Sequence, residues 1–305
     1  MSVVRRAYTR SVTALLRPYI RRELPGWGRL YRRFVGSFDK DHLWQNEPVR
    51  WVRGKLHGYE MALRISGWSN RATFFLGRFY DLPNQLLLQK LLRQGDTFVD
   101  IGANEGMMTL LAARQVGEDG QVLSFEPNPS PRAILEKNLR RNAIEHVQVH
   151  AMGLSDEPGQ LELFVPAVNT GEGSFTPMEG VEGTSVTCPV HVGDEVLHDV
   201  KPKLIKIDVE GFEAHVLRGL QHTIERARPF ITIEMIGGHL ARDGSSPQTI
   251  AELFKDHGYV GHRLGTTKEA GERRLILRDC GPQLPDGDYL WAPAEREEEL
   301  LKETV

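Results

Sequence analysis

The chain has 305 residues, of which 40% are hydrophobic and 26% are charged, and its formal net charge is −3. A chain of this size can bury a large core, and its charge provides no general attraction to nucleic acid. It contains no apolar run of membrane-spanning length, and its two cysteines match no metal-binding spacing, which is typical of a reduced, cytoplasmic protein.

The N-terminal region is strongly basic, because residues 1–40 contain ten Lys or Arg against Glu23 and Asp39. Residues 3–24 predict an amphipathic helix, with apolar side chains at helical spacing and arginines between them. We favour a helix that packs on the rest of its own chain or on a second subunit of a homo-oligomer. The alternative is a contact with an anionic membrane surface, which would make the protein peripheral to the membrane.

Partial alternation over residues 49–66 predicts a β-hairpin or a pair of edge strands. We therefore expect three parts. Residues 1–75 form a basic helical region and hairpin that serves as a cap or an oligomer contact, residues 76–293 form an α/β domain, and residues 294–305 form an acidic C-terminal tail.

From residue 97 onward, strand-like and helix-like segments alternate, which predicts a doubly wound, mostly parallel seven-stranded sheet covered on both faces. The predicted strands are 97–101, 121–125, 147–152, 203–208, 230–235, 258–263 and 287–292. The predicted helices are 106–116, 130–141, 211–226 and 247–257. Two strand-like runs within residues 159–192 interrupt this rhythm and predict an inserted β-hairpin flap, and residues 265–286 are a candidate edge strand.

The most informative segment is a short apolar strand that leads into a turn containing Asp100, Gly102, Asn104 and Gly106. A strand, a tight turn and a helix start form the place where open α/β sheets bind nucleotide-like ligands. The dinucleotide fingerprint G-x-G-x-x-G is absent, and Asp100 would repel a pyrophosphate but could pair with an ammonium group. Glu126, 24 positions after Gly102, suits two ribose hydroxyls. S-adenosylmethionine (SAM), an adenosine joined to an amino acid, fits both carboxylates.

Three motifs in this order resemble the FkbM family of SAM-dependent methyltransferases: Asp100 to Gly106, Phe125-Glu126-Pro127-Asn128, and Ile205 to Glu213. The resemblance covers about residues 75–292 and implies a class I, Rossmann-like methyltransferase fold with SAM as cofactor. It also implies transfer to a hydroxyl of a small molecule, such as a sugar, a glycolipid head group or a natural product. By resemblance, Asn169 and Ser174 in the inserted loop lie over the active site.

For the cofactor, we assign Asp100 and Gly102 to the methionine end, Glu126 to the ribose, and Asn104 and Gly106 to the shape of the turn. Looser assignments around the cofactor are Phe125, Asn128, Gly153 and Asp208.

Candidate catalytic residues follow the fourth and fifth predicted strands. Asp208 and Glu234 end neighbouring strands, so they could share a proton and yield a base with a raised pKa. They could also hold a divalent metal ion, which we do not favour. Glu210 and His239 are further candidates, since an unperturbed imidazole titrates near neutrality. For Lys206, an unusual lysine within a covered strand, we expect Glu234 or Asp100 as the partner.

Two other functions remain open at this point. One is a non-catalytic SAM-binding assembly protein that docks a partner through the basic helix. The other is a methyltransferase that acts on protein. A nucleic-acid methyltransferase is disfavoured, because Asp208-Val209-Glu210-Gly211 stands where enzymes that methylate base amino groups usually carry an Asn/Asp-Pro-Pro-aromatic motif.

Overall fold

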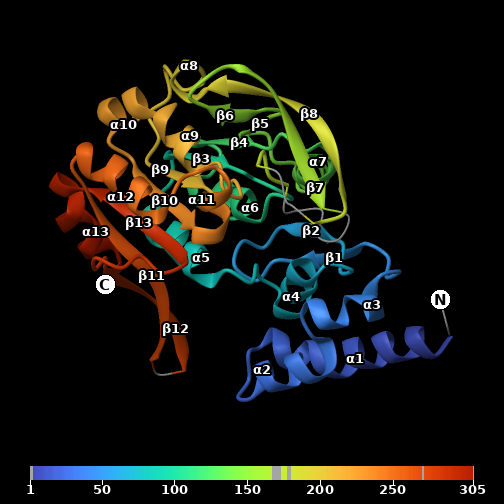
Figure 1. Ribbon diagram of the computed structural model, residues 1–305. Coiled ribbons are helices and arrows are strands. Elements are labelled where there is room, and N and C mark those ends of the chain that lie inside the picture. The colour runs from blue at the N-terminus through green and yellow to red at the C-terminus, as the bar shows by residue number, and fades with distance from the viewer. Residues whose placement is uncertain (1–2, 167–172, 177–179, 270, 305) are drawn as a thin grey trace. The chain divides into compact units, whose positions relative to one another are not determined.

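The computed structural model describes residues 3–166, 173–176, 180–269 and 271–304. The chain divides into two compact units, unit 1 (Met1–Leu82) and unit 2 (Pro83–Val305). Figure 1 shows the helices and the hairpin of unit 1 in blue, and the large sheet of unit 2 in cyan to red. Asn169 belongs to the inserted loop and lies outside the described residues.

Unit 1 is mostly helical. Its elements are α1 (Val3–Arg21), α2 (Trp27–Leu30), the π-helical turn η1 (Tyr31–Val35), the 3-10 turn η2 (Phe38–Lys40), α3 (Asp41–Trp44), β1 (Arg50–Arg53), β2 (Glu60–Leu63) and α4 (Trp68–Leu76). The predicted hairpin is confirmed, because β1 and β2 pair antiparallel. The predicted N-terminal helix is also confirmed, and it ends at Arg21, three residues earlier than expected.

The core of unit 1 surrounds a buried arginine. Arg71 has no exposed surface and donates to Asp41 Oδ1 at 2.7 Å and to the backbone carbonyl of Ser37 at 2.7 Å. Trp44, also fully buried, packs edge-on against Phe75 with 5.7 Å between ring centroids. Helix α1 packs against α4, so unit 1 has a core of its own.

Unit 2 is built on an eight-stranded sheet with the order β12-β11-β13-β10-β9-β3-β4-β5. Its strands are β3 (Thr97–Ile101), β4 (Gln121–Phe125), β5 (Val147–His150), β9 (Leu204–Ile207), β10 (Phe230–Met235), β11 (Tyr259–Glu269), β12 (Glu272–Asp279) and β13 (Gly287–Pro293). Its helices are α5 (Leu82–Leu91), α6 (Met107–Val116), α7 (Pro129–Arg141), α8 (Gly193–Val196), α9 (Glu213–Arg218), α10 (Gln221–Ala227), α11 (Gly237–Arg242), α12 (Pro247–Asp256) and α13 (Glu297–Thr304).

The large sheet is mostly parallel, as predicted. Strands β10, β9, β3, β4 and β5 pair parallel, whereas β13 is antiparallel to both β10 and β11. The expected count of seven strands was one too low, because β12 pairs with β11 at the edge where a candidate strand was noted. After β3 the chain adds β4 and β5 on one side and then returns to add β9 on the other, which creates a topological switch point between β3 and β9.

Two further predictions required correction. The single helix expected over residues 211–226 is split into α9 and α10, with Gly219 and Leu220 between them. At Gly219 the chain passes so close to Ser155 that a Cβ would lie 2.6 Å from its carbonyl carbon. The expected acidic tail instead forms the 3-10 turn η3 (Ala294–Arg296) and α13, and Leu300 on α13 is fully buried.

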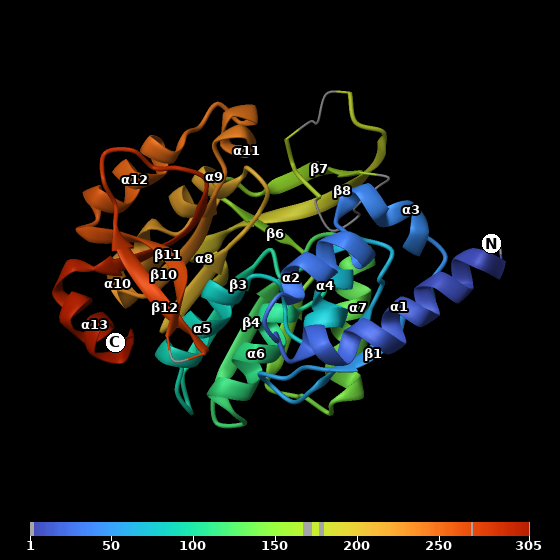
Figure 2. The same cartoon turned by 90° about the horizontal axis from the view of Figure 1, so that it is seen from below.

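The inserted flap is confirmed as an antiparallel hairpin of β7 (Gly159–Pro166) and β8 (Gly183–Val192). A short strand that we did not predict, β6 (Gly153–Ser155), pairs parallel with β8 and completes a three-stranded sheet. Figure 2 shows this small sheet beside the carboxyl end of β3 within unit 2.

Candidate active site

The turn after β3 is shaped by glycines that a side chain could not replace. Gly102 has φ +80°, and a Cβ there would lie 2.9 Å from the carbonyl carbon of Asp208 and closer still to its oxygen. Gly106 has φ +86°, and a Cβ would collide with Leu135 of α7. Asn104 between them has φ 51°, a left-handed conformation that Asn tolerates better than most residues. The turn therefore lies directly against the end of β9.

Asp100 lies at the carboxyl end of β3 and is fully buried. Its Oδ2 accepts a hydrogen bond from Thr109 Oγ1 at 2.6 Å, and Thr109 in turn lies 2.9 Å from Ser124. Burial raises the pKa of Asp100, and the nearby Lys206 charge lowers it. Asp100 Oδ1 has no hydrogen-bond donor among the residues that the structure describes, and Lys206 Nζ is 3.9 Å away. A buried carboxylate oxygen without a donor fits the ammonium group that we expected Asp100 to bind.

Glu126 joins the two turns at the carboxyl ends of β3 and β4. Its Oε2 accepts the backbone N–H of Asn104 at 2.7 Å, and its Oε1 accepts that of Asn128 at 2.8 Å. Burial raises the pKa of Glu126 to about 7, although both N–H donors pull it down. Each carboxylate oxygen has a second lone pair, so Glu126 can still accept from the two hydroxyls of a ribose.

The looser cofactor assignments lie in structural positions. Phe125 has no exposed surface, and its ring stacks on His150 with 4.6 Å between centroids. Asn128 caps α7 by accepting the backbone N–H of Ser130 at 3.1 Å. Gly153 starts β6 and is packed against Phe175 and Val190. These three residues form the framework behind the turn, and their direct contact with a cofactor stays a prediction.

Lys206 is held between two carboxylates. Its Nζ donates to Asp208 Oδ2 at 3.0 Å and lies 3.9 Å from Asp100 Oδ1. Burial lowers the pKa of Lys206, but the charges of Asp208 and Asp100 outweigh it and raise the pKa above its ordinary value. The expected contact between Lys206 and Asp100 is therefore confirmed. Asp208, which we did not predict as a partner, lies closer to Lys206 Nζ. A lysine held in its charged form is a counter-ion and not a base.

A second group of side chains gathers beyond Asp208. Glu210, Glu234 and His239 come from the β9–α9 turn, from β10 and from α11, and each places one potential ligand atom within 4.8 Å of the others. His239 Nδ1 lies 3.1 Å from Glu210 Oε2 without the alignment of a hydrogen bond. The contact with Glu210 nevertheless raises the pKa of His239 and outweighs burial, which lowers it.

Glu234 lies close to several other carboxylates. The charge of Asp208, followed by burial and the charge of Glu210, raises the pKa of Glu234 far above its ordinary value. The two carboxylates expected at neighbouring strand ends therefore interact strongly, as the strand order requires. Two Glu and one His would also suit a divalent cation, and this set shares only Glu234 with the expected pair of Asp208 and Glu234.

The position of Glu210 depends on contacts that sequence reasoning missed. Glu210 has φ 55°, and its carbonyl accepts from Ser174 Oγ at 2.8 Å and from Arg242 at 3.3 Å. Ser174 is fully buried, so it braces this turn from the flap. Glu213 accepts the backbone N–H groups of Val209 and Gly211, both at 3.2 Å, which agrees with a structural role for that carboxylate.

Comparison with known proteins agrees with this architecture. A family model described as the methyltransferase FkbM domain matches residues 100–260. The hexuronic acid methyltransferase AglP of Haloferax volcanii is 28% identical over 218 residues, which cover 66% of this chain and 87% of that protein. Methyltransferase 1 of Beauveria bassiana is 32% identical over 147 residues, which cover 41% of this chain and 59% of that protein.

Among solved structures, the methyltransferase FkbM from Methylobacillus flagellatus KT matches with a TM-score of 0.38 and 15% identity. That match covers 87% of this chain and 60% of the other.

Proposed function

This chain belongs to the FkbM family of SAM-dependent methyltransferases, and on that premise we propose that it methylates a hydroxyl oxygen of a small-molecule acceptor, with His239 as the general base. The observation that carries the proposal is the contact between His239 Nδ1 and Glu210 at 3.1 Å. A carboxylate beside one imidazole nitrogen favours the proton there and leaves Nε2 free to accept a proton from the acceptor.

The residues at the switch point fit SAM in defined roles. Asp100 would take the ammonium group and Glu126 the ribose hydroxyls, and Gly102 lets the turn between them lie against the end of β9. When bound, SAM supplies an electrophilic methyl group on a positively charged sulfur. Lys206 neutralises Asp208 and helps to hold its carboxylate in place at 3.0 Å.

An acceptor hydroxyl is a poor nucleophile until its proton is removed, so a positioned base contributes about 10²–10⁴-fold to the rate. His239 would receive that proton on Nε2 while Glu210 stabilises the resulting imidazolium. In the same step the acceptor oxygen forms a bond to the methyl carbon and the bond from that carbon to sulfur breaks. The orientation of the acceptor contributes further, because bringing two reactants together in the right geometry removes much of the entropic cost.

The surroundings of His239 favour a neutral acceptor. Glu210 and Glu234 lie beside it, with Arg242 as the nearby cation, whereas Asp208 lies near Glu234 and is paired with Lys206. An acceptor carboxylate would be repelled there, whereas a hydroxyl would not. The hexuronic acid named for the Haloferax relative supports a sugar as the first class to test. Because a hexuronic acid also carries a carboxylate, turnover with hexuronic acids but not with neutral sugars would contradict a neutral acceptor.

The experiment measures release of S-adenosylhomocysteine from SAM with a panel of hexoses, hexuronic acids, glycosides and polyols. We expect turnover with at least one hydroxyl acceptor and a fall in kcat of about 10²-fold or more in His239→Ala. His198→Ala is the matched control, because His198 is an exposed histidine paired with Asp199 on the surface. SAM binding without turnover on any acceptor would contradict the proposal and favour a non-catalytic assembly protein.

The same assay with EDTA separates two uses of the cluster. Activity that is unchanged by EDTA supports the base, whereas a loss that Mg²⁺ or Mn²⁺ restores would assign Glu210, Glu234 and His239 to a metal ion. Methylation of a protein substrate in place of any small molecule would favour the protein methyltransferase considered from the sequence.

A further inference from the structure

Unit 1 and unit 2 carry opposite charges. Residues 1–82 contain 16 Lys or Arg against 6 Asp or Glu, a net charge of +10, whereas residues 83–305 contain 22 against 35, a net charge of −13. The basic unit contains none of the side chains assigned to SAM or to the acceptor. We propose that unit 1 docks on an anionic phospholipid surface through the outer face of α1. This inference does not rest on the proposed function.

Helix α1 has two apolar faces, and only one of them is covered. On the inner face, Val12 and Ile20 are buried where α1 packs within unit 1. On the outer face, Val4 is 79% exposed and Leu15 is 75% exposed. These two residues lie on an exposed strip along the helix, which we call the outer strip. Its other exposed members, spaced by three or four residues, are Ala7, Ser11, Ala14 and Pro18. Val4 and Leu15 lie about three helical turns apart, so they indicate a membrane contact only together with the basic side chains beside the strip.

Arginines border the outer strip on one side. Arg6 and Arg10 follow each other by one helical turn, and both are exposed. With Arg50 they line a cavity of about 510 Å³, whose wall also includes Ala14 of the strip. The acidic group in this wall is Glu47, which already accepts from Thr9 Oγ1 at 2.7 Å and from Arg50 Nη2 at 2.7 Å. Because three guanidinium groups line the cavity and its one carboxylate already accepts two hydrogen bonds, the cavity has a net positive charge.

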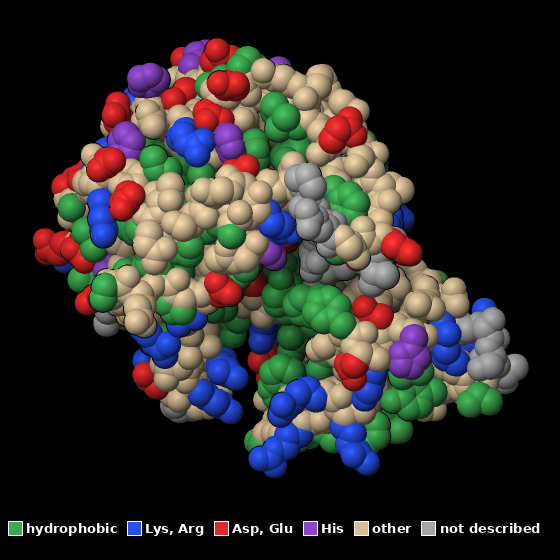
Figure 3. Space-filling model, viewed as in Figure 1, with side chains coloured by type: hydrophobic (Ala, Val, Ile, Leu, Met, Phe, Trp, Pro, Cys, Tyr) green, Lys and Arg blue, Asp and Glu red, His purple; other side chains and the backbone are tan. Residues whose placement is uncertain are grey.

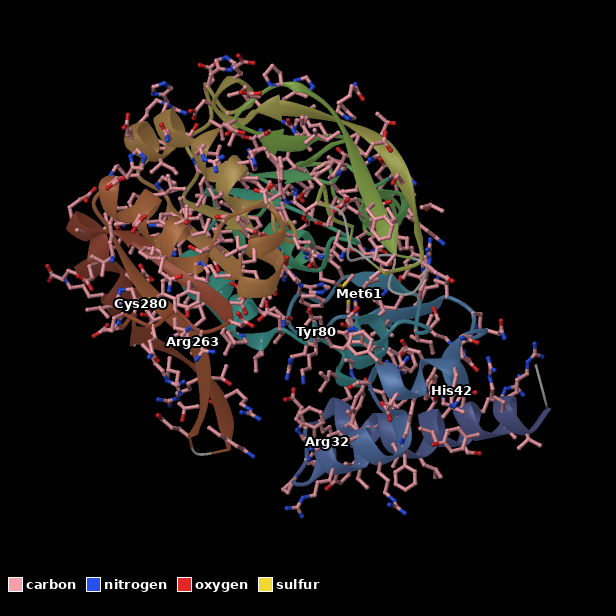
Figure 4. All side chains as sticks on the ribbon, viewed as in Figure 1. Arg32, His42, Met61, Tyr80, Arg263 and Cys280 are labelled. Carbon is pink, nitrogen blue, oxygen red and sulfur yellow. The ribbon has the colours of Figure 1, made fainter. Side chains whose placement is uncertain are left out.

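The combination of strip and cavity fits a phospholipid better than another polyanion. An acyl-chain boundary can cover Val4 and Leu15, while a phosphodiester head group can lie among Arg6, Arg10 and Arg50. A nucleic acid would satisfy the arginines but would offer little to the apolar strip. Figure 3 shows blue and green side chains next to one another over the α1–α2 side of unit 1, and Figure 4 labels Arg32 on that side.

The proposed contact lies in the plane of the membrane surface. Within the described part of the chain, no helix has the length and the apolar character needed to cross a bilayer. Interfacial helices bury a narrow apolar face and keep their cationic side chains at the head groups, which is the pattern of α1.

The test is co-sedimentation of the full chain with vesicles of phosphatidylcholine alone or with about one third phosphatidylglycerol. We expect binding to the anionic vesicles, little binding to phosphatidylcholine, and a loss of at least tenfold when salt is raised from low to about 0.5 M. The double variant Arg6→Gln/Arg10→Gln should lower the partition coefficient about 20- to 30-fold, and Leu15→Gln about tenfold.

The matched control is Arg273→Gln/Arg274→Gln, which removes the same charge from exposed positions on β12 and should change binding by less than twofold. SAM affinity should be equal in all variants, which shows that unit 2 is folded, and an unchanged far-UV circular dichroism spectrum and thermal unfolding transition show that unit 1 is folded as well. Failure to sediment with anionic vesicles at low salt would overturn the proposal. So would binding of inorganic phosphate at Arg6 and Arg10 without vesicle binding, or a dimer in light scattering that Leu15→Gln dissociates.

Discussion

Replacing Gly102 by alanine tests whether the turn after β3 is as closely packed as the structure shows. At φ +80° a side chain is strained, which costs about 1–2 kcal/mol. The new Cβ would also lie 2.9 Å from the Asp208 carbonyl carbon, so β9 would have to move, and forced overpacking of this kind costs about 1–3 kcal/mol. We therefore expect Gly102→Ala to lower the free energy of unfolding of unit 2 by about 2–5 kcal/mol.

The matched control is Gly95→Ala, because Gly95 has φ +86° and nothing within 4 Å of a Cβ. That variant should lose only the backbone term of about 1–2 kcal/mol. Urea unfolding of both variants gives the comparison, and SAM titration gives a second readout, because displacement of Asp208 should weaken SAM binding in Gly102→Ala alone. Equal losses of stability in the two variants would refute the close approach of the turn to β9.

Three further predictions concern the site. Glu126→Ala should raise the SAM dissociation constant about 10- to 100-fold through loss of hydrogen bonds to a charged acceptor, whereas Glu136→Ala on the exposed side of α7 should not. Since the pKa of His239 is raised, the acidic limb of the kcat profile should have its midpoint above pH 6.5, and a midpoint below that value would contradict the pairing with Glu210. Lys206→Met should destabilise unit 2 by about 3–5 kcal/mol in urea unfolding, because a buried carboxylate is left unpaired; a loss below 1 kcal/mol would contradict that ion pair.

Much of the large sheet could be predicted because its strands are short apolar runs that end in turn residues. The bounds of β3 and β4 were predicted to the residue, and those of β9 within one residue at each end. Helix breaks were harder to predict. The interruption after α9 lies where Gly219 approaches Ser155 closely, and a contact between segments that are distant in sequence leaves no periodic signal.

The sequence identified which residues belong to the site, but not how their side chains contact one another. Asp208, Glu210, Glu234 and His239 were all identified, because each lies at or shortly after the carboxyl end of β9 or β10. The pairing of Lys206 with Asp208 was missed, since strand alternation places residues 206 and 208 on one side without showing how closely their side chains meet. Arg242 was missed as a support of Glu210, because a helical arginine carries no sequence signal for the carbonyl it binds.

In the proposed reaction, the carboxylates near His239 give a physical reason for a base at this place. Methyl transfer removes a positive charge from sulfur, and the field of Asp208 and Glu210 would oppose that loss if the charge left the site. When His239 accepts the hydroxyl proton, the positive charge reappears on the imidazole, 3.1 Å from Glu210. The positive charge would then pass from the sulfur to the imidazole and remain near the same carboxylates. The carboxylates that favour a cationic methyl donor would therefore also stabilise the protonated base.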